Sequence, residues 1–188
     1  MVALDKKRAV FFDRDGVLIR SNVRDGRPFA VSKASDMEVL AEAPSAVASL
    51  KSLGFLTIVA TNQPDIATGK LAQAELDAMH RLLAGRMTLD DILVCPHIDA
   101  DQCTCRKPKA GLLHEAARRH NIDLKTSFMV GDRWRDVEAG RAAGCITIFV
   151  DRGYRETLRG PADHVVADVG EAENVVARLT KADPGDGP

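Results

Sequence analysis

AVFFDRDGV, at residues 9–17, carries the strongest structural signal in this chain. Its first four residues form a continuous apolar run, which predicts a buried strand that ends at Asp13. Two carboxylates follow two residues apart, at Asp13 and Asp15, and Gly16 then allows the chain to turn sharply. Ligands of open parallel sheets bind at the carboxyl ends of the strands, so this stretch predicts a site at such an edge.

Short apolar runs alternate with amphipathic segments along the rest of the chain. Further strands are expected at 55–60, 91–94, 127–130, 145–150 and, more weakly, 164–166. Helices are expected at 44–53, 72–85, 111–120, 135–143 and 171–180. Strands separated by helices imply right-handed crossovers and a parallel sheet that is covered on both faces. The sequence therefore predicts an α/β fold.

Length and composition indicate one ordinary globular domain. The chain has 188 residues, 45% hydrophobic and 28% charged, with a formal net charge of −1. This balance gives no reason to expect a nucleic-acid partner or a membrane surface, and no stretch is apolar enough for a membrane span. We expect a monomer in the cytoplasm, where thiols stay reduced.

One domain is expected over residues 1–181, followed by a disordered tail at 182–188. Residues 17–36 form the longest connection, and most of it is polar without a clear period. A loop of that length is typically functional, so we expect it to act as a flap over the site.

Side chains that can take part in catalysis or bind a metal cluster where the predicted strands end. They are Asp13 and Asp15 after the first strand, Thr61 and Asn62 after the second, Cys95 and His97 after the third, and Asp132 and Asp136 after the fourth. In a parallel sheet these ends share one edge, which predicts a functional site there. Paired carboxylates repel each other unless a cation joins them, and an oxygen-only site suits Mg²⁺. Asp132 is expected as a further ligand, and Asp136 as a residue that holds a metal-bound water or the loop.

FFDRDGV, TNQ, CRKP and GDRWRD, in that order, resemble the four motifs of the haloacid dehalogenase superfamily of phosphohydrolases. The resemblance covers residues 8–150 and implies a Rossmann-like, doubly wound sheet and phosphoryl transfer through an aspartyl-phosphate. It implies that Asp13 is the nucleophile and that Asp15 is the general acid and then the base. It also implies that Asp13, the backbone carbonyl of Asp15, and Asp132 hold Mg²⁺.

Further roles follow from the same resemblance. Thr61 and Lys107 are expected to stabilise the phosphoryl group, and Asn62 to bind the substrate. Two positions depart from the superfamily pattern. Val17 stands where threonine is usual, and Pro64-Asp65 stands where a small Ser-Gly pair is expected.

CPHIDADQCTCRKP, at residues 95–108, holds three cysteines and one histidine. Cys95, His97, Cys103 and Cys105 form a complete tetrahedral zinc set without an open position for water, which favours structural over catalytic zinc. A disulfide is the weaker alternative for a cytoplasmic chain. Cys145 lies in an apolar run and is expected to be a core thiol.

The spacing CPH…CxCRKP resembles a small, nearly capless subgroup with a structural zinc loop, here residues 95–105. This subgroup contains D-glycero-D-manno-heptose 1,7-bisphosphate 7-phosphatase and histidinol-phosphatase. The resemblance implies a small phosphorylated metabolite as substrate, with heptose bisphosphate first and histidinol phosphate or another small sugar phosphate as the alternative. It further implies that Arg106 and Arg133 contact the substrate. A phosphate-binding module without turnover is a more distant alternative. His80, His114 and His120 are expected at helix surfaces without partners.

Overall fold

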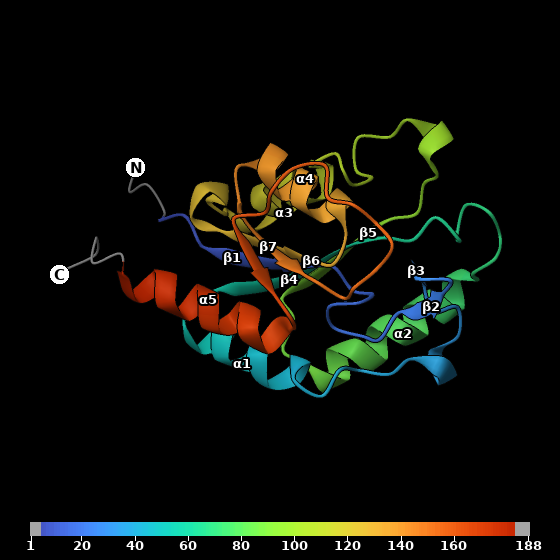
Figure 1. Ribbon diagram of the computed structural model, residues 1–188, viewed down its shortest axis with the longest axis horizontal. Helices are drawn as coiled ribbons and strands as arrows, with labels where there is room; N and C mark the ends of the chain where they lie inside the picture. Colours follow the sequence, from blue (N-terminus) through green and yellow to red (C-terminus); the bar gives the residue numbers. More distant parts are fainter. Residues whose placement is uncertain (1–4, 183–188) are drawn as a thin grey trace.

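The computed structural model describes residues 5–182, and its centre is a six-stranded parallel sheet (Figure 1). The strand order is β5-β4-β1-β6-β7-β8. The strands of this sheet are β1 (Ala9–Phe12), β4 (Leu56–Asn62), β5 (Asp91–Cys95), β6 (Phe128–Gly131), β7 (Ile146–Val150) and β8 (His164–Val166). The helices are α1 (Ala43–Ser52), α2 (Gln73–Arg86), α3 (Gly111–His120), α4 (Trp134–Ala143) and α5 (Val169–Ala182), with short 3-10 turns η1 (Ala34–Asp36), η2 (Asp99–Asp101) and η3 (Leu124–Thr126).

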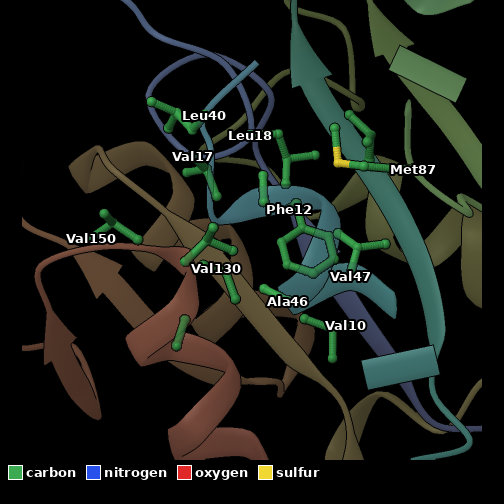
Figure 2. Packing of buried hydrophobic residues seen from close by; sticks show 14 of the residues in the cluster. Val10, Phe12, Val17, Leu18, Leu40, Ala46, Val47, Met87, Val130 and Val150 are labelled. Atoms are coloured by element: carbon green, nitrogen blue, oxygen red, sulfur yellow. The ribbon is translucent and has the colours of Figure 1, made fainter. Parts of the chain in front are cut away.

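Strand β1 is central, and its side chains bury both faces of the sheet. Val10 and Phe12 pack into the cluster that includes residues of α1, α2 and α5 (Figure 2). Ala9 and Phe11 pack into the opposite cluster, which includes residues of α3. All four side chains are completely buried, and burying one phenylalanine contributes roughly 1.5–3 kcal/mol. The apolar run at 9–12 therefore holds the two helical layers together.

Helices cover both faces of the sheet, as the alternating pattern predicts. In Figure 1, α3 and α4 lie on one side of the sheet, and α1, α2 and α5 lie on the other. Helix α4 contacts β6 and β7, while α1 packs against α5. The doubly wound α/β prediction is confirmed.

The predicted elements agree with the observed ones within two residues at each end. The largest difference at a strand end is in β4, which extends through Thr61 and Asn62. These two residues continue the ladder with β5, where they pair with Val94 and Cys95. Thr61 and Asn62 are thus the last residues of the strand, and not the first residues of the loop that follows it.

The connection after β1 differs from the flap predicted at 17–36. Val17, Leu18 and Ile19 are completely buried and belong to the core (Figure 2 labels Val17 and Leu18), so the exposed part begins at Arg20. The apolar Val17 is accommodated because its side chain points into this cluster.

The exposed part of the connection contains an antiparallel hairpin that the sequence analysis missed. Strands β2 (Asn22–Arg24) and β3 (Arg27–Phe29) are joined by Asp25 and Gly26, both with positive φ. An Asp-Gly pair is the usual signal for such a two-residue turn. The signal was present, but the short strands around it lack alternation.

Two further predictions concern the end of the chain and membranes. Ala182, the first residue of the predicted tail, is the last residue of α5, and 183–188 lie outside the described residues. Among residues 5–182, no helix has the length and apolarity needed to cross a membrane.

Candidate active site

The topology brings the predicted sequence motifs to one edge of the sheet. Phe12 of β1 pairs with Val59 of β4 on one side and with Val130 of β6 on the other. Asp13 follows Phe12 directly, and its backbone N–H donates to the Val130 carbonyl at 2.9 Å. The carboxyl ends of three neighbouring strands therefore meet around Asp13, as predicted.

Lys107 is the cation at the centre of this edge. Its Nζ lies 2.9 Å from Oδ1 of Asp13 and 2.6 Å from Oδ1 of Asp136, and it donates to the Ala60 carbonyl at 2.7 Å. These three acceptors match the three donors of an ammonium group. Burial disfavours the charged form, but the negative charges of Asp13 and Asp136 outweigh it and raise the pKa of Lys107. Lys107 is thus a fixed positive charge.

Asp13, Asp132 and Asp136 form a compact acidic cluster. One carboxylate oxygen from each lies within 4.8 Å of the others. Burial raises the pKa of Asp132 well above its ordinary value, and the charges of Asp13 and Asp136 add to this, although the neighbouring Tyr154 hydroxyl opposes it. Burial also raises the pKa of Asp136 to about 6, against the opposing charge of Lys107. The cluster holds more negative charge than Lys107 balances.

The acidic cluster fits a hard divalent cation. Asp132 is 2% exposed, and neither of its carboxylate oxygens has a hydrogen-bond partner of normal geometry among the described residues. Buried carboxylates without donors are costly unless a cation joins them, and oxygen ligands suit Mg²⁺. Gly16 permits this arrangement, because its φ is +84° and a Cβ there would lie 1.7 Å from Oδ2 of Asp132.

Asp136 has two structural partners in addition to its place in the cluster. Its Oδ1 pairs with Lys107, and its Oδ2 accepts the backbone N–H of Arg133 at 3.0 Å. The second bond ties the loop after β6 to the first turn of α4. The structure therefore places Asp136 where it holds the loop, which is one of the two roles expected of it.

Asp15 is held by donors from three parts of the chain. The Arg14 guanidinium contacts Oδ2 at 2.9 Å, and Nε2 of Gln63 donates to the same oxygen at 3.0 Å. The backbone N–H of Val31, from the flap, donates to Oδ1 at 3.3 Å. Oδ1 has the longer contact, so it is the less tightly held of the two oxygens.

The buried Arg14 and the half-buried His80 form a pair that the sequence analysis missed. Arg14 is completely buried, and its Nη1 lies 3.4 Å from Nε2 of His80 on α2. Burial, together with the positive charge of Arg14, lowers the pKa of His80 to about 4. His80 is therefore neutral near pH 7 and can accept from Arg14. The prediction that His80 has no partner was wrong, because its partner is 66 residues away in sequence. It was also wrong for His120, whose Nε2 lies 2.9 Å from Oδ2 of Asp91.

Thr61 and Asn62 end the same strand but have different surroundings. Asn62 exchanges two hydrogen bonds with the backbone of Lys107, at 3.0 Å and 3.1 Å. Thr61 is buried, and its Oγ1 accepts from Gln63 at 3.0 Å, which leaves its own proton free to be donated. Asn62 lies on the wall of the cavity described below, whereas Thr61 does not.

A cavity of about 630 Å³ opens above these residues. This volume is ordinary for a small-molecule site. Asp13, Asp15, Lys107 and Asp132 lie in its wall, together with Pro64 and Asp65, the two departures from the superfamily pattern. Two predicted substrate contacts also lie there, but both are engaged by acids. Arg106 donates to Asp99 at 2.7 Å, and Arg133 donates to Glu156 at 2.8 Å.

Cys95, His97, Cys103 and Cys105 converge beside this cavity. Their Sγ–Sγ distances are 3.2–3.7 Å, and two thiols lie 3.4 and 3.6 Å from Nδ1 of His97. A disulfide requires about 2.05 Å between sulfurs, so the thiols are unbridged. Ligand sulfurs of a tetrahedral zinc lie about 3.8 Å apart, given Zn–S near 2.3 Å, so the cluster fits zinc.

Burial is the main influence on the thiols of this cluster. It raises the pKa of Cys95 to about 12, and the neighbouring thiol of Cys105 adds to the rise. A metal cation at the centre would reverse this preference, because it binds the thiolate form. Cys145, by contrast, is a buried thiol outside the cluster, as expected.

Several contacts connect the cysteine loop to Lys107. The Arg135 guanidinium reaches both Asp99, at 3.2 Å, and the Lys107 carbonyl, at 3.3 Å. The side chain of Lys109 donates to the Cys103 carbonyl. The loop and the catalytic edge are thus one connected structure.

Comparison with known proteins places this site in a family. A model described as HAD-hydrolase-like matches residues 104–172. A Pasteurella multocida protein is 34% identical over 187 residues, which cover 92% of this chain and 98% of that protein. An Escherichia coli K12 protein is 37% identical over 188 residues, which cover 92% and 95%. Both are named D-glycero-beta-D-manno-heptose-1,7-bisphosphate 7-phosphatase.

Solved structures agree with the sequence relatives. The D,D-heptose 1,7-bisphosphate phosphatase from B. bronchiseptica, complexed with magnesium and phosphate, superposes with a TM-score of 0.79 and 30% identity. The match covers 92% of this chain and 99% of that one. The resemblance that the motifs predicted is confirmed. The chain belongs to the haloacid dehalogenase-like phosphatases, in the family of the heptose-1,7-bisphosphate 7-phosphatases, and is a phosphoric monoester hydrolase.

Proposed function

We propose that this enzyme removes the 7-phosphate of D-glycero-D-manno-heptose 1,7-bisphosphate, with Mg²⁺ as its catalytic cofactor. The observation that carries the proposal is the similarity over nearly the whole chain to relatives with that named activity. The acidic cluster around Lys107 supports it, because its donors and charge suit Mg²⁺ and a phosphoryl group.

Asp13 is the proposed nucleophile. Lys107 holds its buried Oδ1, which leaves Oδ2 as the attacking oxygen. In the first step Oδ2 bonds to phosphorus, and the bond between phosphorus and the sugar oxygen breaks. Asp15 gives the proton on its Oδ1 to the departing alkoxide. The product of this step is an aspartyl-phosphate on Asp13.

Water completes the reaction. Asp15, now a carboxylate, takes a proton from water as the water oxygen bonds to phosphorus, and the bond from Asp13 to phosphorus breaks. Throughout both steps, the fixed positive charge of Lys107 is proposed to stabilise the phosphoryl oxygens, and the free hydroxyl proton of Thr61 is the proposed additional donor. Mg²⁺ held by Asp13, Asp132 and the carbonyl of Asp15 would supply further positive charge to these oxygens.

A structural zinc held by Cys95, His97, Cys103 and Cys105 is part of the proposal. Its proposed effect is to order the loop that carries Arg106 and Lys107, since zinc ligation contributes folding free energy directly. We also propose that Asn62, Arg106 and Arg133 contact the substrate. The cavity wall holds all three, which supports this role.

A single-domain, monomeric enzyme of the cytoplasm remains our prediction. Unbridged thiols support a reducing compartment. Sedimentation of the purified protein tests the monomer, since a mass of twice 20.3 kDa would contradict it.

A substrate panel tests the proposed function. We would compare kcat/KM for both anomers of the heptose bisphosphate, for histidinol phosphate and for fructose 1,6-bisphosphate, all with Mg²⁺. Phosphorus NMR identifies which phosphate leaves. The heptose bisphosphate is expected to have the highest kcat/KM, with loss of its 7-phosphate. A preference for histidinol phosphate would overturn the proposed substrate, and no turnover of any ester would favour a non-catalytic phosphate-binding module.

A further inference from the structure

His80 lies on the packed side of α2, although its side chain is polar. The buried residues of this helix are Leu76, Met79 and Leu83. His80 is half-buried and comes three residues before Leu83, which puts both on the same face of the helix. From this face its Nε2 reaches Arg14, at 3.4 Å from Nη1. His80 therefore belongs to the interior arrangement beside the catalytic edge.

Arg14 is held from two sides. Among residues 5–182, its side chain has two hydrogen-bond or ion-pair partners, Asp15 and His80. Its Nε donates to Oδ2 of Asp15 at 3.0 Å, and its Nη2 lies 2.9 Å from the same oxygen. Arg14 is completely buried, so a donor that loses its partner there is costly. The orientation of the guanidinium thus depends on a carboxylate on one side and an imidazole on the other.

A neutral imidazole is the form that can complete this arrangement. Burial and the charge of Arg14 lower the pKa of His80 to about 4, although the charge of Asp77, one turn earlier on α2, opposes the shift. Near pH 7 the lone pair of Nε2 can therefore accept from Nη1 of Arg14, with the ring proton on Nδ1. The two donor groups of the guanidinium that do not face Asp15 and the one acceptor on α2 are thus matched in kind.

The other oxygen of Asp15 is also supported from α2. The backbone N–H of Val31 donates to Oδ1 of Asp15 at 3.3 Å. Three residues later, the backbone N–H of Ala34 donates to Oε2 of Glu75 on α2 at 2.8 Å, and η1 packs against this helix. Helix α2 therefore supports both carboxylate oxygens, one through Arg14 and the other through the flap.

We propose that His80 is a positioning residue for Asp15, which it orients by fixing the guanidinium of Arg14. His80 does not line the cavity, so it acts through Arg14 and not on the substrate. The inference rests on the proposed function, because it takes Asp15 as the general acid of the first step. Without the acceptor on His80 the guanidinium can turn, and the proton that Asp15 gives to the leaving alkoxide is then less well aligned.

Esters with different leaving groups separate proton donation from the rest of the chemistry. An alkyl phosphate needs a proton from Asp15, whereas the leaving group of p-nitrophenyl phosphate departs without one. We would measure kcat/KM, which covers the steps up to the aspartyl-phosphate, for p-nitrophenyl phosphate and for the best alkyl ester of the substrate panel. In His80→Leu, the alkyl value is expected to fall about tenfold, because the acid is present but misaligned. The aryl value should stay at its wild-type level, which also shows that the variant folds.

Further variants at the same position test whether the acceptor matters. His80→Phe keeps a ring but no acceptor, and is expected to behave as His80→Leu. His80→Gln keeps a neutral acceptor, and both of its values should stay near those of wild type. The matched control is His114→Leu, because His114 is an exposed histidine on α3 that does not line the cavity. It should leave both values unchanged.

A double variant tests the route through Arg14. Arg14→Met should lower the alkyl value at least as much as His80→Leu does, since it removes the guanidinium itself. Adding His80→Leu to Arg14→Met should cause no further loss, because two residues that act through one contact are not additive. A further loss in the double variant would show that His80 acts by another route, and would overturn the proposal.

The remaining outcomes separate this role from the proposed function. Unchanged alkyl hydrolysis in His80→Leu and His80→Phe, or an equal loss for both esters, overturns the positioning role and leaves the proposed function standing. Asp15→Asn is the reference for the function. If that variant hydrolyses the alkyl ester at the wild-type rate, or if wild type hydrolyses no ester, the proposed function fails and the positioning role fails with it.

Discussion

The side chain of Asn62 and the backbone of Lys107 are joined by two reciprocal hydrogen bonds. Nδ2 of Asn62 donates to the Lys107 carbonyl at 3.0 Å, and Oδ1 accepts the Lys107 N–H at 3.1 Å. The end of β4 therefore sets the position of the backbone from which the central cation projects. Both groups lie on the cavity wall, so the same pair also shapes the space for substrate.

Replacing Asn62 with alanine should lower kcat by about tenfold or more, because Lys107 loses its backbone anchor. The free energy of unfolding should fall by about 1–3 kcal/mol, the usual range for two lost neutral hydrogen bonds. Steady-state kinetics and urea unfolding measure the two effects. Asn62→Asp keeps the acceptor but loses the donor, and is expected to lie between. Loss of stability with an unchanged kcat would show that Asn62 does not position Lys107.

Replacing Asp15 with asparagine should remove turnover of alkyl phosphates by at least a hundredfold, in the range of general acid–base contributions. An aryl phosphate has a good leaving group, so p-nitrophenyl phosphate should still give one equivalent of p-nitrophenol before the aspartyl-phosphate stalls. Rapid mixing detects that burst. Near-wild-type turnover of an alkyl phosphate would remove Asp15 from the chemistry.

Replacing Cys105 with serine should remove zinc and lower kcat at least tenfold, since Lys107 lies two residues beyond the last proposed ligand. The matched control is Cys145→Ala, which alters a buried thiol outside the cluster and should retain zinc. Elemental analysis and kinetics are read on the same preparations. A zinc-free wild-type protein with full activity would contradict the proposed role of the metal.

Stabilisation by Mg²⁺ should grow as pH rises from 5 to 7. Asp132 and Asp136 have raised pKa values in the folded protein, about 6 for Asp136, so at low pH they hold protons that compete with the cation. The difference in Tm with and without Mg²⁺, measured at pH 5, 6 and 7, reports this competition. A difference that does not change with pH would show that these carboxylates are not the binding site.

His80 should make the protein less stable as pH falls from 6.5 to 4. Its folded pKa is lowered to about 4, so the unfolded chain binds more protons in this window, and the free energy of unfolding rises with pH. Discounted for partial exposure, the contribution is about 1–2 kcal/mol. His80→Gln should lose this part of the pH dependence, which urea unfolding at pH 4.5 and 7 would measure. Identical pH profiles for wild type and variant would refute it.

Local patterns predicted the sheet and the catalytic edge well, for a physical reason. The run at 9–12 is apolar because helices cover both faces of β1, and polar residues begin where the strand leaves these helical layers. Because β1 and β6 are parallel neighbours, their carboxyl ends lie side by side, and this alone brings Asp13 and Asp132 together. The four cysteine and histidine residues lie within eleven positions, so their convergence is also a local property.

Contacts between distant segments were beyond such patterns. Nothing in the spacing of α2 shows that His80 faces Arg14, and the clamp between Asn62 and Lys107 joins residues 45 positions apart. Arg14 is charged and was therefore not expected in the interior, yet it is completely buried. The hairpin at the flap had a local signal at Asp25-Gly26, but its exposed strands have no buried face to create an alternating pattern.

The charges around Lys107 have a consequence for the order of events in a catalytic cycle. Asp13, Asp15, Asp132 and Asp136, all counted as carboxylates, are paired among residues 5–182 with two cations, Lys107 and Arg14. Before Asp15 takes up the proton that it later gives to the leaving group, the inner site therefore has a formal excess of two negative charges. One divalent ion cancels that excess. A phosphate ester that arrives first meets repulsion, whereas one that arrives second meets a neutral site with oriented donors. Substrate and metal should therefore load in sequence, metal first.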